Sequence, residues 1–431
     1  MPIIAVMKRT VLVFITVVLS GVSSGLLRAQ PADTTFVKEA STVFGSVERI
    51  CRQDSGRLWG RDLCCPLVIA RRESRAAVSN CEHLLARSIP YNGLYYGFLD
   101  DTVVIAGTAC AINGTVCAML PWELAANTGT WQAFLHEMFH AFQNNKGWKY
   151  VYDNSHLDRP DARVLLSCEM RALLKALASD SAERRRYLTE ALFFRRQRNR
   201  ISPEKAMDES HFEMHEGLAD YTQYRLCLPS DEEIVSRLSN ELSAVLNQDG
   251  FSRSYGYTVG AVYAFFNDVR PGWRLCVDTL SSLSMLTQRI YGIDIGATDS
   301  ANVWEDYCVD SLLVVEDSIF QVKIQVKEKV YQAIEQNNVL VLDYDGCQFG
   351  FNPNHVVGFD EGKNFYQFME IRGDFGVVYT VYGCLLSDKI YVLIPDGVVL
   401  QEKETYPERF SLQLNKGWRI DGNSIISSIK Q

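Results

Sequence analysis

Two histidines and a glutamate lie close together in the segment TWQAFLHEMFHAFQN, residues 130–144. His136 and His140 are four residues apart, and residues at this spacing share one face of a helix. Their imidazoles can therefore offer one nitrogen each to a single metal ion, for which zinc is the natural choice. Glu137 follows the first histidine and is placed to act as a general base on a water whose pKa the metal lowers. The pattern predicts a hydrolytic zinc site that still needs a third protein ligand.

The same pattern permits a purely structural interpretation, in which two helix histidines are satisfied by nearby carbonyl groups. The flanking residues favour the metal, because they make the segment apolar on nearly all sides and so predict a buried helix. Buried polar groups need partners, and a zinc ion supplies one for each imidazole. The apolar residues of the segment are Trp131, Phe134, Leu135, Met138, Phe139 and Phe142.

A second segment, HFEMHEGLADYTQYR at residues 211–225, contains candidates for the third ligand. Glu216 and Asp220 are four residues apart and share a helical face. One carboxylate can bind the metal, while the other accepts the second N–H of a ligating imidazole. Other residues could also serve as the third ligand, namely Glu213, His215, His211 and, on an intervening helix, Glu169.

Together, HEMFH and EGLADY resemble the gluzincin metallopeptidases, the thermolysin-like and zinc-aminopeptidase-like class. In that family the Glu before Gly is the third zinc ligand, which maps onto Glu216. The acidic residue four positions later supports a zinc-bound histidine, which maps onto Asp220. Some members also use a tyrosine in a Tyr-x-x-Gly setting to stabilise the oxyanion, which maps onto Tyr257, with Tyr255 as the alternative. The resemblance implies a zincin-like fold, bound Zn²⁺, and peptide-bond hydrolysis of a peptide or protein substrate.

The chain departs from the family pattern in two ways. Residues 141–215 form a long interval between the two motifs, which predicts an additional helical insertion. The Gly-x-Met-Glu-Asn element of the aminopeptidases is absent, so aminopeptidase specificity is not implied. In the family an extended substrate pairs with an edge strand before the motif helix, and Val103–Thr108 is the candidate here.

The spacing of apolar residues predicts an α+β fold. Strand pairs are expected over 66–80 and 101–120, the second joined through Asn113-Gly114, a strong hairpin signal. Helices are expected over 35–53, 130–145, 161–179, 182–199, 203–226, 231–247, 256–268 and 277–291, with 302–336 mostly helical. Short β-type runs follow. We therefore expect a zincin-like domain over 30–336, with a small sheet and a large helical part, and a small all-β module over 337–431 for docking or as a lid.

The N-terminal residues predict export. Lys8 and Arg9 precede an apolar run over 11–19, and a plausible cleavage site follows Ala29, as in a secretory signal peptide over 1–29. We expect the mature protein to be periplasmic or extracellular, without a stable membrane anchor. The chain has twelve cysteines and no CxxC spacing. Export permits disulfides without determining their pairing, and the cysteines could equally be small buried thiols.

The net charge of −9 argues against nucleic acid as a main partner, because phosphate binding needs a basic surface. The one basic cluster is expected to form a solvated helix face and comprises Arg184–Arg186, Arg195, Arg196, Arg198 and Arg200. The best hypothesis is an exported zinc metallopeptidase. Two alternatives remain: a zinc hydrolase with a non-peptide substrate, and a zinc-binding, non-catalytic protein with a peptidase fold.

Overall fold

The computed structural model describes residues 33–125, 130–248, 250–297, 300–351, 356–359, 363–394, 400, 403–406 and 409–427. The chain is α+β, as predicted, and divides into two compact units. The first unit ends at Leu313 and the second begins at Val314, inside helix α13 (Val309–Glu335). The boundary thus lies earlier than the expected one after residue 336. The expected signal peptide over 1–29 lies outside the described residues.

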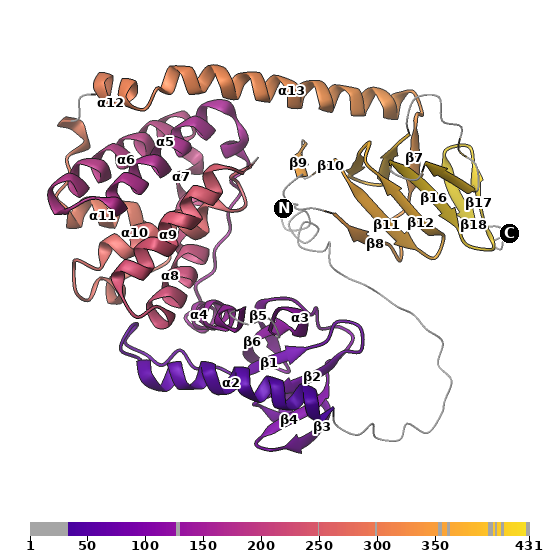
Figure 1. Cartoon of the computed structure of the whole chain (residues 1–431), viewed down its shortest axis with the longest axis horizontal. Helices are drawn as coiled ribbons and strands as arrows, with labels where there is room; N and C mark the ends of the chain where they lie inside the picture. The colour runs from indigo at the N-terminus through magenta and orange to yellow at the C-terminus, as the bar shows by residue number, and fades with distance from the viewer. Residues whose placement is uncertain are drawn as a thin grey trace. The chain divides into compact units, whose positions relative to one another are not determined.

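The first unit begins with helix α2 (Thr34–Asp54), which packs on a six-stranded sheet (Figure 1). Asp33 caps the helix by accepting a hydrogen bond from the N–H of Phe36, which satisfies one of the free donors of the first turn. The sheet order is β3-β4-β2-β1-β6-β5, and only β1 and β6 are parallel. Its strands are β1 (Leu67–Ala70), β2 (Ala76–Ser79), β3 (Ala86–Tyr91), β4 (Leu94–Phe98), β5 (Thr108–Ile112) and β6 (Thr115–Pro121).

Both predicted strand pairs are present, and the second turns through Asn113-Gly114 with both residues at positive φ. The predicted edge strand over Val103–Thr108 is wrong, because regular pairing starts only at Thr108 and the edge strand is β5. Strands β3 and β4 were not predicted. Their turn, Asn92-Gly93, also has two positive φ values, so the dipeptide was the signal that could have found them.

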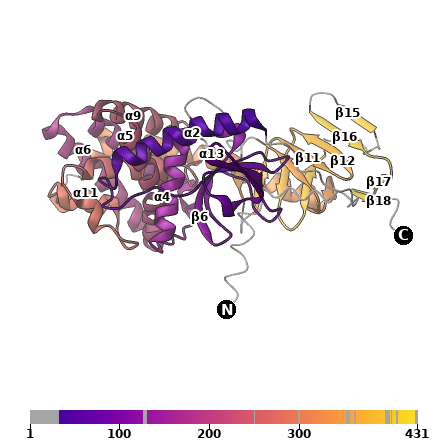
Figure 2. The same cartoon turned by 90° about the horizontal axis from the view of Figure 1, so that it is seen from below.

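The rest of the first unit is helical, and α4 packs against β6 and β5 (Figure 2). Helices α5 and α6 pack on each other and form the expected insertion between the two motifs. The expected helix over 277–291 begins only at Leu283, after a short 3-10 turn and an irregular stretch that contains a turn at residues 278–281. The helices are α3 (Trp122–Ala125), α4 (Ala133–Asn145), α5 (Pro160–Ala178), α6 (Ser181–Ile201), α7 (Ala206–Phe212), α8 (Leu218–Cys227), α9 (Asp231–Leu246), α10 (Tyr255–Asn267), α11 (Leu283–Ile290) and α12 (Ser300–Asp306).

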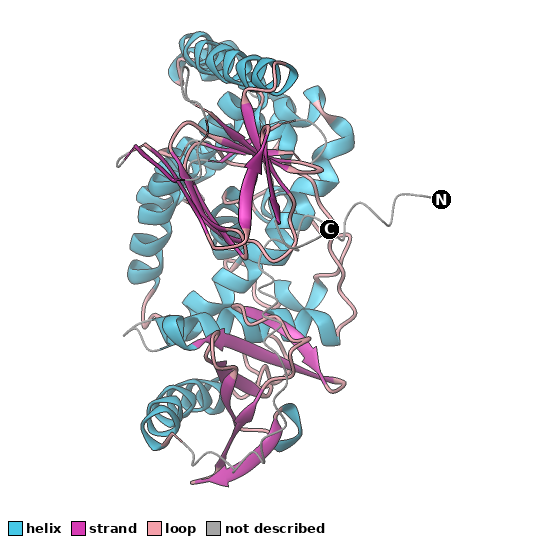
Figure 3. Cartoon of the chain, turned by 90° about the vertical axis from the view of Figure 1, so that its right-hand side faces the viewer, coloured by secondary structure: helices cyan, strands magenta, loops and turns pink. Residues whose placement is uncertain are grey.

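The second unit contains most of α13 and a β-rich module, as expected, built from two sheets (Figure 3). One sheet has the order β17-β18-β7-β14-β13-β10-β9 and the other β15-β16-β12-β11-β8. Their strands are β7 (Val339–Leu342), β8 (Gln348–Gly350), β9 (Val356–Gly358), β10 (Asn364–Tyr366), β11 (Met369–Gly373), β12 (Gly376–Thr380), β13 (Cys384–Leu386), β14 (Ile390–Leu393), β15 (Lys403–Tyr406), β16 (Phe410–Leu414), β17 (Trp418–Asp421) and β18 (Ser424–Ser427). Within the described residues, every helix is too short or too polar to cross a membrane.

The basic cluster of α6 was expected to form a solvated helix face. This expectation is wrong for Arg195 and Arg198, which are buried. Arg195 is 5% exposed and Arg198 is fully buried. Residues three apart on a helix share a face, and this face of α6 points into the core of the unit. Burying two guanidinium groups requires charged partners, which come from other helices and include Glu169 on α5 and Glu209 on α7.

Candidate metal centre

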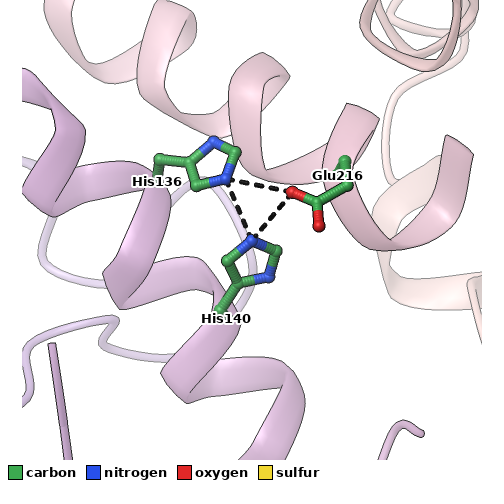
Figure 4. A group of neighbouring side chains, drawn as sticks. All are labelled: His136, His140 and Glu216. Atoms are coloured by element: carbon green, nitrogen blue, oxygen red, sulfur yellow. Dashed lines mark hydrogen bonds and ion pairs between the residues drawn. The ribbon is translucent and has the colours of Figure 1, made fainter. Parts of the chain in front are cut away.

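Three side chains from two helical segments converge in the first unit (Figure 4). Helix α4 presents His136 and His140, and a π-helical turn (Glu213–Gly217) between α7 and α8 presents Glu216. The Nε2 atoms of the two histidines are 2.9 Å apart. Glu216 Oε2 lies 3.2 Å from the Nε2 of His136 and 3.1 Å from that of His140. Within the described part of the chain, this is the one group of His, Cys, Asp or Glu residues whose ligand atoms lie close enough to share a metal ion.

The outer nitrogens of both histidines are occupied by acceptors. His136 Nδ1 lies 2.7 Å from Asp220 Oδ1, and an ionised carboxylate can only accept. His140 Nδ1 lies 2.8 Å from Gln143 Oε1. The orientation of this amide follows from its nitrogen, which donates to two backbone carbonyl groups. Both imidazoles therefore carry a proton on Nδ1, and in their neutral forms both present an Nε2 lone pair to the centre.

Two lone pairs and an anionic oxygen that face one another repel unless a positive charge lies between them. Zinc bonds to nitrogen and oxygen of about 2.1 Å in a tetrahedron place ligand atoms roughly 3.4 Å apart. The separations of 2.9–3.2 Å between these ligand atoms are within a few tenths of an ångström of that value. The donor set and its spacing therefore fit a zinc ion with one position left open.

In the absence of a metal, a proton can occupy the same site. The pKa values of His136 and Glu216 show that the protonated pair is strongly favoured. Burial lowers the pKa of His136, but hydrogen bonds with Asp220 and Glu216 outweigh burial and raise it to about 10. Burial raises the pKa of Glu216, but hydrogen bonds with three histidines bring it far below its usual range. A metal ion that binds here must displace this proton, so metal affinity is expected to rise with pH.

Glu137 lies beside the ligands and beside the backbone that leads into the edge strand. A Cβ built on Gly107, just before β5, would be 3.5 Å from Glu137 Oε1. Burial raises the pKa of Glu137, while the neighbouring His136 and His140 act in the opposite direction without cancelling it. A raised pKa makes this carboxyl group a stronger proton acceptor than an ordinary glutamate.

The two predicted tyrosine candidates have different surroundings. The ring of Tyr257 stacks on that of His136, with ring centroids 5.9 Å apart. Burial, and next the charge of Glu216, raise the pKa of Tyr257, so its hydroxyl stays protonated and can donate a hydrogen bond. Tyr255 is fully buried and its hydroxyl donates to the backbone oxygen of Glu209, 3.4 Å away. Of these two tyrosines, Tyr257 therefore borders the candidate metal centre and Tyr255 does not.

A third tyrosine, Tyr152, borders the centre and was not predicted from the sequence. Its hydroxyl lies 3.5 Å from Glu216 Oε1 and 3.2 Å from His215 Nδ1. Tyr152 belongs to the irregular segment between α4 and α5, and no spacing or motif distinguishes it from the other tyrosines of the chain. Only the fold of that segment over α7 brings its hydroxyl to the ligands.

Two of the alternative carboxylate ligands are used elsewhere. Glu213 pairs with Arg195 through both of its oxygens. Glu169 is fully buried, 2.7 Å from Arg195 Nε and 2.7 Å from Arg198 Nη2, and accepts a hydrogen bond from Tyr263. These carboxylates face a buried cluster of charges behind the centre rather than the centre itself.

The two alternative histidines also differ from each other. His211 is turned outward, with Nδ1 3.0 Å from the backbone oxygen of Val151. His215 lies next to the ligands, because its Nδ1 is 3.1 Å from Glu216 Oε1 and its ring centroid is 4.4 Å from that of His140. His215 therefore contacts the candidate ligands Glu216 and His140 but does not belong to the group whose ligand atoms converge.

The π-helical turn explains how Glu213 and Glu216 can face different surroundings although they are only three residues apart. Residues three apart lie nearly above one another on an α-helix, whereas the wider π turn rotates them away from each other. The turn is held close to α10 by paired glycines. A Cβ on Gly217 would lie 2.5 Å from Gly260 Cα, and a Cβ on Gly260 would lie 2.6 Å from the backbone oxygen of Glu213. The Gly that follows the third candidate ligand is therefore required by helix packing.

Gln143 is a further residue that the sequence analysis missed. It is almost fully buried, and besides accepting from His140 it donates to the backbone oxygens of Met214 and His215 at 3.0 and 3.1 Å. One side chain thus orients an imidazole on α4 and the turn that carries Glu216. Its position three residues after His140 on the same helical face was a signal that could have suggested this role.

Searches of protein-family models, of curated proteins and of solved structures find no match to this chain.

Proposed function

We propose that this chain is an exported zinc-dependent metallopeptidase. The observation that supports the proposal most directly is the convergence of the Nε2 atoms of His136 and His140 with Glu216 Oε2. Their separations of 2.9–3.2 Å and the acceptors on both Nδ1 atoms favour a cation between them. Zinc is preferred because the set combines two imidazoles with one carboxylate.

In the proposed reaction, Glu137 is the general base. Bound zinc supplies Lewis-acid activation, which lowers the pKa of water into the neutral range and polarises a carbonyl group. Glu137 accepts the proton of the attacking water and passes it to the leaving amine, for which its raised pKa is suitable. Asp220 holds the imidazole of His136 in the correct tautomer and orientation.

Two tyrosine hydroxyls are available for the charge that develops on the substrate oxygen. Tyr257 lies against His136, and Tyr152 lies within 3.5 Å of Glu216. Burial raises the pKa of both, so both remain hydrogen-bond donors over the physiological range. A fixed donor at this place stabilises an oxyanion more than it stabilises the ground-state carbonyl group.

A peptide substrate is favoured by the position of the sheet edge. Within the described residues, β5 ends its sheet and pairs with β6 alone, so one side of its backbone could accept an extended peptide. The backbone at Gly107, which leads into β5, lies next to Glu137. A peptide added to this edge would run past the general base. The second unit remains a proposed docking or lid element.

Export is proposed from the N-terminal sequence alone. The basic pair, the apolar run over 11–19 and the cleavage site after Ala29 favour a periplasmic or extracellular location for the mature protein.

The substitution Glu137→Gln tests the proposed function. Because Glu137 is not a ligand, the variant should retain zinc at wild-type stoichiometry while peptide hydrolysis falls by about 10²–10⁴-fold. Zinc is measured by elemental analysis, and hydrolysis is measured by cleavage of a diverse peptide library. The matched control is Glu39→Gln on the exposed face of α2, which should change neither quantity.

The two alternative functions predict other results. A wild-type protein that holds zinc but cleaves no library peptide would favour a zinc hydrolase of a non-peptide substrate or a non-catalytic binding protein. A purified protein that holds no stoichiometric zinc after incubation with the metal would refute all three hypotheses.

A further inference from the structure

Two cysteines face each other across the hairpin at the sheet edge. Strands β5 and β6 are antiparallel, and their register pairs Cys110 directly with Cys117. The two-residue turn Asn113-Gly114 determines this register, since both of its residues have the positive φ that such a turn requires. Residues that are directly opposite point to the same face of a sheet, with Cα atoms about 4.5–5.5 Å apart. This separation is within the range of about 4.4–6.8 Å that a disulfide spans.

The Cys117 side chain is already in contact with Cys110. Its Sγ lies 3.5 Å from the backbone oxygen of Cys110. Cys117 is fully buried, whereas Cys110 is partly exposed. The neighbouring Cys117 thiol lowers the pKa of Cys110, while the Cys110 thiol raises the pKa of Cys117. An oxidant can therefore reach the more acidic thiol first, and the buried thiol is placed to react second.

We propose that Cys110 and Cys117 form a redox-responsive disulfide that staples the edge hairpin. The oxidant would be a small-molecule or protein disulfide. The Cys110 thiolate attacks one sulfur of that disulfide, forms a mixed disulfide and releases one thiol. The Cys117 thiol then loses its proton and attacks Cys110 Sγ, which releases the second thiol. Two electrons and two protons pass from the cysteine pair to the oxidant.

The staple would act on the strand that borders the candidate centre. Among the described residues, β5 is one of the two strands that end this sheet and has a hydrogen-bonded neighbour on one side, so it can separate more easily than the inner strands. Helix α4, which carries Glu137, packs on both β5 and β6. Under oxidising conditions the covalent bond across the two strands would limit fraying of this edge, and reduction of the bond would restore it. The disulfide does not depend on the proposed zinc chemistry, and its test does not measure hydrolysis.

The test uses the full-length protein equilibrated in glutathione buffers that range from reducing to oxidising. Free thiols are trapped by alkylation, and peptides are mapped by mass spectrometry without reduction. We expect a linked species in which Cys110 and Cys117 are joined and both residues are protected from alkylation. Amide hydrogen exchange in β5 should slow by about tenfold or more on oxidation, as the closed hairpin opens less often.

Two cysteine variants show whether Cys117 is the partner of Cys110. In Cys117→Ser, Cys110 should accumulate as a mixed disulfide with glutathione, because the second thiol is missing. The matched control is Cys276→Ser at an exposed position, which should leave the linked species unchanged. The proposal is overturned if both thiols are still alkylated in the oxidising buffer, or if Cys110 joins glutathione or another cysteine instead of Cys117 in the wild-type protein.

Discussion

The substitution Gln143→Met tests whether one buried amide organises the candidate metal centre. Methionine has a similar length and volume, so the main loss is the set of three buried hydrogen bonds to His140 and to the carbonyl groups of Met214 and His215. At about 1 kcal/mol each, their removal should lower the free energy of unfolding of the metal-free protein by roughly 3 kcal/mol.

The same substitution should weaken zinc binding separately from its effect on stability. Without Gln143, the hydrogen bond that keeps the proton of His140 on Nδ1 is lost, and the turn that carries Glu216 loses two of its hydrogen bonds with α4. Loss of a residue that orients a ligand usually weakens metal affinity by about 10–100-fold, or roughly 1.4–2.7 kcal/mol. Competition titration with a zinc chelator measures the affinity, and urea denaturation of the metal-free protein measures the stability.

The control is Asn144→Ala, one residue further along the same helix on its exposed face. This variant should bind zinc like the wild type and change stability by less than about 0.5 kcal/mol. If Gln143→Met loses stability but binds zinc with wild-type affinity, the hydrogen bonds only stabilise the fold, and the argument that Gln143 orients the ligands is wrong.

The remaining predictions concern helix packing and pH. Gly260→Ala should lower the free energy of unfolding by about 1–3 kcal/mol and weaken zinc binding, because the new Cβ would meet the backbone oxygen of Glu213 at 2.6 Å and push the π-helical turn away; urea denaturation and chelator titration measure the two effects. Burial raises the pKa of Glu213 from 4.5 to about 7, although Arg195 opposes the shift. Between these values the folded state retains a proton that the unfolded chain releases, so this group makes the free energy of unfolding fall as pH rises from about 4.5 to 7. Glu213→Gln should remove that part of the slope when unfolding is measured at a series of pH values.

Gly45→Ala is the control for Gly260→Ala. Gly45→Ala lies in the exposed part of α2, where a Cβ meets nothing within 4 Å, and should stabilise the protein by about 0.5–1 kcal/mol. Equal effects of Gly45→Ala and Gly260→Ala would show that the close contact with the π-helical turn is unimportant. An unchanged pH slope in Glu213→Gln would show that Glu213 is ionised throughout this range.

Much of the fold followed from local patterns in the sequence. Helices α4, α5, α6, α9 and α10 begin and end within a few residues of their expected bounds, because each is an apolar-periodic segment with breakers at its ends. The hairpin at Asn113-Gly114 was predictable for the same local reason. The segment 277–282 is expected to be helical because its apolar spacing continues that of α11. It is not helical, because Ser282 caps the N-terminus of α11 and the helix starts after it.

Long-range features could not be predicted in this way. The sequence placed Arg195 and Arg198 on a basic helix, but only the packing of α6 against α5 and α7 decides that they are buried against carboxylates. The edge strand was assigned to residues before Thr108, because a one-dimensional pattern does not show which backbone groups find partners in a sheet.

For the candidate centre, the sequence by itself determined which residues could share a metal. Spacing of four residues places His136 with His140, and Glu216 with Asp220, on common helical faces. The tertiary structure decided which carboxylate joins the histidines. The π-helical turn, held against α10 by Gly217 and Gly260, directs Glu216 to the imidazoles and leaves Glu213 to the buried Arg195. Helical periodicity is a local property of the chain, whereas the choice between two nearby carboxylates depends on which helix packs behind them.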